Sequence, residues 1–434
     1  MPADPTVAAL LAERASAGQK RILAAVASLA SRLEAPTYMV GGAVRDLLKT
    51  GKLKDFDFVV EGDGLALARL LAQELEARVK THERFLTAEI WSTEFRLDVV
   101  SARSEVYGQP AGLPTVTSGS LEDDLARRDF TVNAMAVTLW PAGRDALIDP
   151  FEGRRDLEQG WLRILHEHSF FDDPTRILRG VRLGSRLGLQ LEPATDALAV
   201  AAIESGALTP LSADRLRREL ILLLEESRVR ASLHDLERLG FFEILGRSRT
   251  ISPAEWEAVQ GIAELRTHWR TGEPPMTEVR WWLAFLMSLY IAEPPSSRSS
   301  LAARVGLDDG LRRIFMDFPD RIDRVMSSLS DSGIEPHTVS EIVGELTPEE
   351  LVLVVATAGG QAHAWLENWL EEVGLVRLRI GGGDLINEGF PPGPEIGVAL
   401  QATLDARMDD IIGPDEELGF AIRQLMGERS GGES

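Results

Sequence analysis

The first candidate site is a pair of glycines that follows a short apolar stretch. Gly41 and Gly42 come directly after Thr37–Val40, and Arg45 stands three residues farther on. Glycines at the end of a strand let the backbone approach a phosphate closely and offer N–H groups to it. An arginine at this spacing can reach the same phosphates. The segment therefore indicates a phosphate-binding turn.

Two aspartates, Asp55 and Asp57, follow this turn. In a strand, alternation places both carboxylates on one face, with Phe56 on the other. Paired hard carboxylates suit Mg²⁺, which keeps waters and substrate phosphates as its other ligands. A third carboxylate on a neighbouring strand would complete a two-metal site for nucleotidyl transfer to a 3′-hydroxyl, and Asp98 is the candidate. Alone, the two glycines could be an ordinary turn, and the two aspartates could be solvated surface residues. The glycines followed by the aspartates, in this order, are a more specific signal.

A second cluster combines charge with an amide. Arg128 can bind phosphate, while Asp129 and Asn133 could hydrogen-bond ribose hydroxyls. The alternative is a surface ion-pair patch that leads into a strand. That alternative does not explain Asn133, which we expect just inside an apolar strand, where a polar side chain is costly unless bonded.

A third cluster begins a predicted helix near Pro174. Asp173 suits the N-cap, and Asp173 and Arg176 would be neighbours on one helix face. A fixed carboxylate and guanidinium can together read the Watson–Crick edge of a base, and Arg179 and Arg182 could hold a triphosphate. The alternative is an ordinary cap with ion pairs three residues apart.

The elements that must position these residues change in type along the chain. The first ~150 residues predict a mixed sheet with helices, whereas helical periodicity dominates afterwards. Expected helices there cover 173–190, 194–204, 212–226, 229–240, 253–268, 276–291, 310–328, 348–357 and 361–373, with a Pro/Ser-rich break at Glu293–Ser300. Earlier, we expect helices over 5–34 and Leu65–Glu76, and strands at Thr37–Val40, Phe56–Val60, Leu86–Trp91, Phe95–Val100 and Val132–Leu139.

The composition is that of a globular protein of 434 residues, 44% apolar and 26% charged. The absence of cysteine excludes disulfides, cysteine zinc sites and thiol nucleophiles. No apolar run approaches the ~18–20 residues of a membrane span, and no signal peptide is evident. We expect a cytoplasmic protein with no membrane association and no evident protein partner.

Taken over the whole chain, the net charge of −22 argues against binding of nucleic acid. The charge is segregated, however. From Glu371 onward there are 13 acidic and 5 basic residues, whereas arginines stand at 163, 176, 179, 182 and 186. We therefore expect a local basic groove within an acidic exterior.

The three clusters, in this order, resemble the class II tRNA nucleotidyltransferase and bacterial poly(A) polymerase family of the polymerase-β superfamily. GGAVRD with DFD looks like its metal motif, RRDFTVNA like its ribose motif, and DDPTR with ILRGVR like its amino-acid template for the incoming base. Ser212–Leu220 is similar to a segment that steadies the template helix. The strong match covers about residues 36–225, and Asp172 stands where the family frequently has Glu.

The resemblance implies an α+β fold, with a polymerase-β-like head followed by an all-helical neck, body and tail. The expected domains are 1–150 (catalytic head), 151–245 (neck with the template helix), 246–370 (body) and 371–434 (tRNA-binding tail). Asp55 and Asp57 would bind Mg²⁺, and Asp98 would be the third catalytic carboxylate. The implied nucleotide-binding residues are Gly41, Gly42, Arg45, Arg128, Asp129, Asn133, Asp173, Arg176, Arg179 and Arg182.

The implied reaction is template-independent transfer of CMP or AMP from CTP or ATP to the 3′ end of tRNA. Family members add CCA, CC, A or poly(A), and the segment Val106–Val116 influences this choice. Its Pro-Ala-Gly-Leu-Pro form looks more like A-adding or CC-adding members, and we favour A-adding. The alternatives are CC-adding or full CCA-adding enzymes, a poly(A) polymerase, which the acidic tail disfavours, and an inactive RNA-binding protein on the same fold. A nucleotidyl-transferring toxin or antibiotic-modifying enzyme would not need the ribose cluster and the template helix together.

Overall fold

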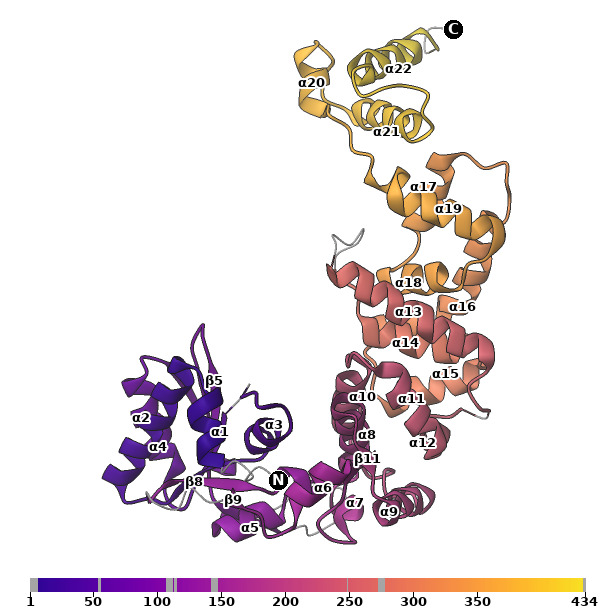
Figure 1. The fold of residues 1–434 in the computed structure, drawn as a ribbon. Coiled ribbons are helices and arrows are strands. Elements are labelled where there is room, and N and C mark those ends of the chain that lie inside the picture. The colour runs from indigo at the N-terminus through magenta and orange to yellow at the C-terminus, as the bar shows by residue number, and fades with distance from the viewer. Residues whose placement is uncertain are drawn as a thin grey trace. The chain divides into compact units, whose positions relative to one another are not determined.

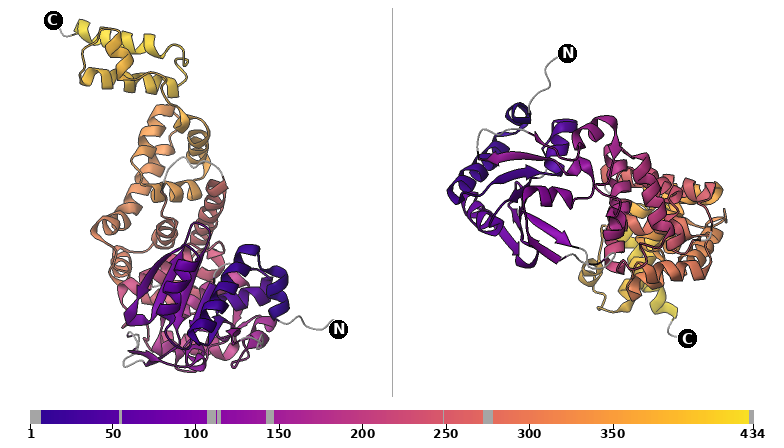
Figure 2. Two further views of the ribbon diagram at one scale, coloured as in Figure 1. Left: turned by 90° about the vertical axis from the view of Figure 1, so that its left-hand side faces the viewer. Right: turned by 90° about the horizontal axis from the view of Figure 1, so that it is seen from below.

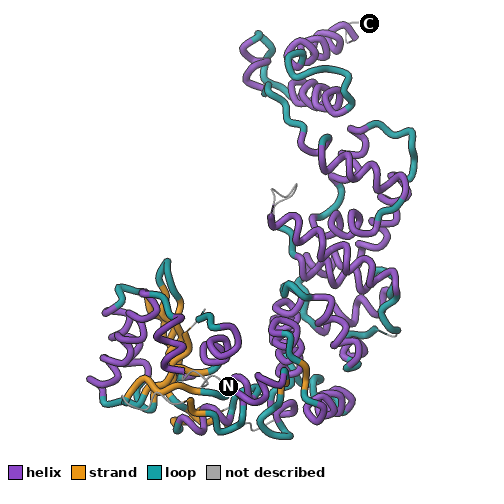
Figure 3. The backbone as a smooth tube through the Cα atoms, viewed as in Figure 1, coloured by secondary structure: helices purple, strands orange, loops and turns teal. Residues whose placement is uncertain are grey.

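The computed structural model describes residues 7–53, 56–106, 112, 115–141, 147–247, 249–271 and 278–431. The chain forms two compact units, Met1–Ile244 and Leu245–Ser434. Within the described residues every strand belongs to the first unit, and the second unit contains helices and loops (Figure 3). None of the described helices is both long enough and apolar enough to cross a membrane.

The first unit is built on a seven-stranded sheet. The strands are β1 (Thr37–Val40), β2 (Phe56–Val60), β3 (Arg78–His82), β4 (Thr87–Trp91), β5 (Arg96–Ser101), β6 (Arg103–Val106), β7 (Thr115–Ser118), β8 (Ala136–Trp140), β9 (Leu147–Ile148), β10 (Trp161–Leu162) and β11 (Gln190–Leu191). The sheet has the order β3-β4-β5-β2-β1-β8-β9, and only its β2–β5 pair is parallel among the described strands. A hairpin, β6–β7, and a parallel pair, β10–β11, lie outside it.

Helices surround this sheet and extend the first unit beyond it. They are α1 (Val7–Arg14), α2 (Ala17–Leu33), α3 (Gly42–Thr50), α4 (Gly64–Glu74), α5 (Leu121–Ala126), α6 (Gly153–Gln159), α7 (Ser169–Asp172), α8 (Thr175–Leu187), α9 (Pro193–Glu204), α10 (Ala213–Leu224), α11 (Val229–Arg238) and α12 (Phe241–Ile244), with 3-10 turns η1 (Glu83–Phe85) and η2 (Thr131–Asn133). Helices α2 and α4 pack together along one face of the sheet (Figures 1 and 2). Helix α8 packs against α7, α10 and α11.

The alternation of β2 separates the apolar core from the candidate site. Phe56 and Phe58 are buried, and their rings stack 5.6 Å apart. Asp57 and Val59 point to the opposite face, because successive side chains in a strand alternate. Val59 packs there in a cluster with Leu125 of α5. The strand therefore presents Asp57 on the face that does not hold the Phe56 and Phe58 rings.

The second unit is a succession of packed helices. They are α13 (Pro253–Thr271), α14 (Trp281–Tyr290), α15 (Pro295–Arg304), α16 (Asp309–Leu329), α17 (Pro336–Gly344), α18 (Pro348–Thr357), α19 (Gly360–Glu371), α20 (Gly382–Asn387), α21 (Pro394–Met408) and α22 (Glu417–Gly431), with the 3-10 turn η3 (Val373–Leu375). Helix α13 packs on α14 and α18, and α20–α22 share a small apolar core of their own. The helical nature predicted for this part of the chain is confirmed.

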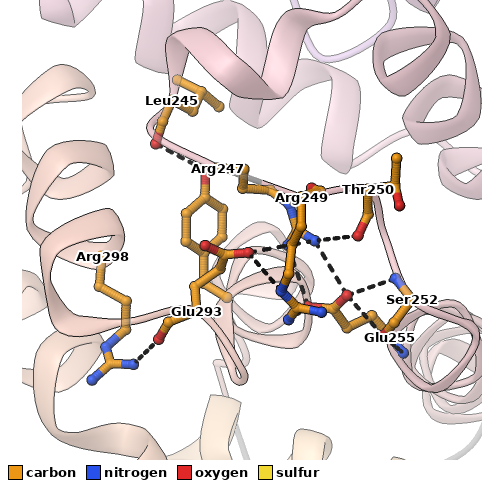
Figure 4. A network of polar contacts seen from close by, with 9 residues as sticks. Leu245, Arg247, Arg249, Thr250, Ser252, Glu255, Glu293 and Arg298 are labelled. Carbon is orange, nitrogen blue, oxygen red and sulfur yellow. Dashed lines mark hydrogen bonds and ion pairs between the residues drawn. The ribbon is translucent and has the colours of Figure 1, made fainter.

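A buried ionic network holds the first residues of the second unit (Figure 4). Arg247 and Glu255 are both buried, with Arg247 Nη2 3.2 Å from Glu255 Oε2. Arg249 Nε lies 3.0 Å from Glu293 Oε1, which belongs to the loop after α14. Because a buried charge is costly unless it is paired, these contacts fix the segment before α13 against that loop.

The strands at Thr37–Val40 and Phe56–Val60 are confirmed to the residue, and the paired strands near 86–100 are confirmed as β4 and β5. Two expectations about the chain after residue 150 are wrong here. Residues 293–300 are not simply a break, because α15 begins at Pro295, where a first helical turn tolerates proline. Strand pairing also continues after residue 150, in β10 and β11.

Candidate functional site

The Gly41-Gly42 turn joins β1 to α3 in a conformation that only glycine adopts readily. Gly41 has φ +67° and ψ −128°. A Cβ atom at this position would lie 2.5 Å from Arg128 Nη1. The guanidinium of Arg128 therefore rests directly against the turn, and the first two sequence clusters meet here.

Arg45 and Asn133 link the turn to the second cluster. Arg45, on the first turn of α3, is buried and donates from Nε to Asp46 Oδ1 at 2.8 Å and from Nη1 to Asn133 Oδ1. Asn133 Nδ2 in turn donates to Asp129 Oδ1 at 2.8 Å. The expected position of Asn133 inside a strand is wrong. It ends the 3-10 turn η2, and β8 begins three residues later at Ala136.

Asp129 is a largely buried carboxylate, 10% exposed, that already accepts four hydrogen bonds. Oδ1 accepts from the N–H of Phe130 (2.9 Å) and from Asn133, while Oδ2 accepts from Arg179 Nη2 (2.7 Å) and Nε (3.2 Å). Burial alone would raise the pKa of Asp129, but the charge of Arg179, the bonds from Asn133 and Arg179, and the charge of Arg176 lower it to about 2. Asp129 is therefore ionised at neutral pH.

Asp124 orients two consecutive arginines. It is fully buried at the end of α5 and accepts from Arg127 through Oδ1 and from Arg128 Nη2 through Oδ2, the latter at 2.9 Å. Arg127 Nη1 also donates to Glu105 Oε1 at 2.9 Å. The Nε of Arg128 is buried and has no hydrogen-bond partner among the residues that the structure describes. Arg128 thus keeps an unused donor beside the glycine turn.

Asp173 and Arg176 are each fixed by contacts with other residues of the first unit. Asp173 Oδ1 accepts from Arg215 Nη2 at 2.7 Å and from Thr175. Arg176 is buried and donates from Nη1 to Ser169 Oγ at 2.5 Å and from Nη2 to the carbonyl of Arg127 at 2.6 Å. The expectation that Asp173 caps one helix that also carries Arg176 is wrong in detail. Asp173 lies in extended backbone between α7 and α8, and Pro174 is the N-cap.

Arg179 and Arg182 follow on α8, next to Glu219 of α10. Arg179 Nη1 lies 3.8 Å from Glu219 Oε1, and Arg182 Nη2 lies 3.6 Å from Glu219 Oε2. The Asp129 carboxylate raises the pKa of Arg179, whereas burial lowers that of Arg182. Glu219 therefore faces two guanidiniums at distances longer than a hydrogen bond.

Asp98, the predicted third carboxylate, lies next to Asp57 of the predicted aspartate pair. Asp57 of β2 and Asp98 of β5 are direct partners in the parallel register. Directly opposed residues on neighbouring strands point to the same face. Asp55 lies outside the described residues. Among the residues described, no group of three or more histidine, aspartate or glutamate side chains gathers to hold a metal ion.

A cleft of about 730 Å³ within the first unit brings most of these residues together. The sequence-predicted residues that line it are Gly42, Arg45, Asp57, Arg128, Asp129, Asn133, Asp173, Arg176, Arg179 and Arg182. A smaller cavity of about 300 Å³ contains Asp98 and shares Asp57 and Arg128 with the cleft. Among the described residues, eight basic and five acidic side chains line the cleft, which supports the expected local basic groove.

Several residues that line this cleft are not among those that the sequence predicts to bind a nucleotide. Lys52 and Arg186 line it, and Arg127 lines it while anchoring Glu105 of the β6–β7 hairpin. The signal for Arg186 was present, because it continues the spacing of Arg179 and Arg182 along the same helix. Nothing in the local pattern indicated Ser169, whose contact with Arg176 comes from a separate helix.

Comparison with known proteins gives a consistent result. A family profile described as the poly A polymerase head domain matches residues 37–163. The A-adding tRNA nucleotidyltransferase of Halalkalibacterium halodurans is 38% identical over 378 residues, which cover 86% of this chain and 85% of that protein. The CC-adding tRNA nucleotidyltransferase of Deinococcus radiodurans is 30% identical, with 90% and 89% covered.

Another relative is longer than this chain. The A-adding tRNA nucleotidyltransferase of Geobacter sulfurreducens is 32% identical over 402 residues, which are 90% of this chain but 45% of that protein. Among solved structures, a CCA-adding enzyme in an apo form superimposes with a TM-score of 0.80 at 29% identity, covering 96% of this chain and 98% of the other. The Thermotoga maritima CCA-adding enzyme complexed with tRNA_CCA gives a TM-score of 0.77 at 28% identity, with 97% and 98% covered.

Proposed function

The chain belongs to the tRNA nucleotidyltransferase family, and from this premise we propose that it transfers AMP or CMP from a nucleoside triphosphate to the 3′ end of tRNA. The observation that carries the proposal is the single cleft lined by the phosphate-binding turn, the ribose cluster and the Asp173/Arg176 pair. A nucleotide needs groups for its phosphates, its sugar and its base, and the cleft supplies all three.

The arginines of the cleft would hold the triphosphate. Arg45, Arg128, Arg179 and Arg182 all line it, and guanidiniums bind phosphate oxygens with charge-assisted hydrogen bonds. Arg128 is already oriented by Asp124, and Arg45 by Asn133. Asp129 would reach a ribose hydroxyl only by exchanging one of its four present hydrogen bonds.

Asp55, Asp57 and Asp98 would hold the metal ions, which we propose to be Mg²⁺. The paired register of Asp57 and Asp98 fits this role, because hard carboxylate oxygens on one face of a sheet are suitable ligands. Mg²⁺ there would neutralise charge on the triphosphate and lower the pKa of the attacking 3′-hydroxyl. Asp57 and Asp98 would help to orient the two reacting groups on the sheet face opposite the Phe56 and Phe58 rings.

Asp173 and Arg176 would select the incoming base. A carboxylate accepts from exocyclic amino groups, while a guanidinium donates to ring nitrogens and carbonyls. Both side chains are fixed before a nucleotide arrives, Asp173 by Arg215 and Arg176 by Ser169. Fixed donors and acceptors discriminate because a wrong base leaves buried groups unpaired.

Among the family's reactions we favour the addition of A. Relatives from Geobacter sulfurreducens, Halalkalibacterium halodurans and Aquifex aeolicus are named A-adding enzymes, and the sequence of the segment 106–116 resembles A-adding or CC-adding members. The second candidate is CC addition, which the Deinococcus radiodurans relative favours. Residues 107–111 and 113–114 of this segment lie outside the described residues.

The helical second unit would bind the body of the tRNA. We place the borders of head, neck, body and tail at 150/151, 245/246 and 370/371. A tRNA substrate also makes a cytoplasmic location the natural one. The test is incubation of the protein with tRNAs that end before CCA, in C and in CC, each with one labelled nucleoside triphosphate. We expect AMP incorporation on the tRNA ending in CC; incorporation of CMP on the shortest tRNA would favour CC addition instead. No incorporation on any of them would overturn the proposal.

A further inference from the structure

Ser169, which lies outside the three sequence clusters, contacts both members of the Asp173/Arg176 pair. Its hydroxyl accepts a hydrogen bond from Arg176 Nη1 at 2.5 Å, and its carbonyl accepts one from the N–H of Asp173 at 3.2 Å. Ser169 is the first residue of α7 and is fully buried. It is absent from the described lining of the cleft, so any effect on the bound nucleotide passes through its neighbours.

The guanidinium of Arg176 has two fixed acceptors on its inner side. One is Ser169 Oγ, and the other is the carbonyl of Arg127, at 2.6 Å from Nη2. A guanidinium is planar and carries five N–H donors. Two acceptors from separate segments fix the plane, and the remaining donors are available to the cleft that Arg176 lines. Without one acceptor the plane can rotate about the other.

We propose that Ser169 is a positioning residue for base selection, its hydroxyl fixing the plane in which Arg176 presents donors to the incoming base. This inference rests on the proposed function, in which Asp173 and Arg176 read that base. A rotated guanidinium still contributes its positive charge, but its donors no longer align with one base edge. Ser169 therefore governs the choice between nucleotides more than the rate of addition.

The two contacts of Ser169 can be separated by substitution. In Ser169→Ala the carbonyl still accepts from the N–H of Asp173, whereas the hydroxyl contact with Arg176 is lost. The Asp173 carboxylate also keeps its bond from Arg215 at 2.7 Å. The variant therefore releases Arg176 while Asp173 stays in place.

The experiment measures kcat/KM for ATP and for CTP on the same truncated tRNA, in wild type and in Ser169→Ala. We expect the ratio of preferred to disfavoured nucleotide to fall about tenfold, a change of ~1.4 kcal/mol, with an unchanged KM for tRNA. The ratio does not depend on the active fraction of the protein, so partial misfolding leaves it unaltered. Ser232→Ala is the matched control, because Ser232 of α11 is also fully buried and its hydroxyl has no partner among the described residues. Its ratio should equal that of wild type.

A double-mutant cycle with Arg176→Lys tests the route of the effect. If Ser169 acts through the guanidinium plane, Ser169→Ala lowers the ratio no further in the Arg176→Lys background. The inference would be overturned if the ATP/CTP ratio of Ser169→Ala equalled that of wild type, or if Ser169→Ala lowered the ratio in the Arg176→Lys background as much as it does in wild type. In either case, nucleotide addition by the wild-type protein would still uphold the proposed function. A wild-type protein that incorporates no nucleotide would overturn the proposed function itself.

Discussion

Replacing Arg179 by methionine would remove the principal counter-charge of the Asp129 carboxylate, whose side chain is only 10% exposed. Arg179 donates two hydrogen bonds to Asp129 Oδ2, at 2.7 and 3.2 Å. The chain offers a matched control in Arg238, which binds Asp196 through two hydrogen bonds of 2.7 and 2.8 Å in the same unit. The control carboxylate is more open to solvent, since Asp196 is 26% exposed and Asp129 is 10% exposed, whereas Arg238 and Arg179 are similarly exposed, at 44% and 39%. The two arginine-to-methionine variants therefore differ mainly in the burial of the carboxylate left behind.

The structure sets the expected size of the effect. The pKa of Asp129 falls from its ordinary 3.8 to about 2, a shift that corresponds to about 2 kcal/mol of stabilisation. Removing one partner of a buried pair costs about 3–5 kcal/mol, because the other charge stays buried without compensation. Because Arg179 is 39% exposed, the loss should fall below this range, and we expect Arg179→Met to lower the free energy of opening of α8 by about 2 kcal/mol at pH 7. Arg238→Met should cost less than ~1 kcal/mol.

The pH dependence of the difference follows from the pKa of Asp129. In wild type this folded-state pKa is depressed, so its stabilising contribution is complete above the unfolded value of 3.8 and is lost as the pH falls toward about 2. In Arg179→Met, burial is no longer offset by that charge, and the pKa of Asp129 rises. Arg179→Met is therefore most destabilised at neutral pH. The difference in opening free energy between wild type and Arg179→Met narrows at acid pH, because Asp129 of the variant takes up a proton.

Hydrogen exchange of the α8 backbone amides, followed in the full chain at pH 7 and about pH 5, measures the local opening free energies. A local probe is needed because a chain of two compact units does not unfold in one step. Equal losses in the Arg179 and Arg238 variants, or a loss at Arg179 that does not change with pH, would refute this reasoning.

Three further predictions concern the cleft itself. Gly41→Ala should reduce nucleotide addition at least tenfold, because the new Cβ would lie 2.5 Å from Arg128 Nη1. The control is Gly160→Ala, where φ is +81° but no described atom lies within 4 Å of the new Cβ, so the variant should lose only ~1 kcal/mol of stability and keep its activity. Equal activities of the two variants would contradict this prediction. Asp57→Asn should abolish addition while a gel shift still detects tRNA binding, and retained turnover would refute its catalytic role. Asp173→Ala should relax the choice between ATP and CTP more than it weakens tRNA binding; unchanged selectivity would return Asp173 to an ordinary structural role.

The residues of the cleft could be predicted from sequence where local pattern determines their position. Thr37–Val40 and Phe56–Val60 are short apolar segments bounded by turn residues, and such segments form strands wherever a core accepts them. The same alternation places Asp57 opposite the Phe56 and Phe58 rings. The adjacency of Asp57 and Asp98 is different, because strand pairing is set by the whole sheet and the local sequence only suggests which strands become neighbours.

Other features depend on contacts between distant segments. Asp129 is held by Arg179, 50 residues away, so its four hydrogen bonds and its low pKa have no local signature. Asn133 ends a 3-10 turn instead of lying in the expected strand, and Gly153 of α6 packs against this turn so closely that a Cβ would lie 2.1 Å from the carbonyl oxygen of Thr131. Tertiary packing overrides the strand propensity of that segment.

The most direct test of the central claim is extension of a tRNA that ends in CC, with ATP as the sole nucleotide and Mg²⁺ present, resolved to single nucleotides on a sequencing gel. The proposed mechanism predicts addition of one AMP with release of pyrophosphate by wild type, and none by Asp57→Asn. A wild-type protein that extends neither this tRNA nor the two shorter ones with any nucleoside triphosphate would contradict it.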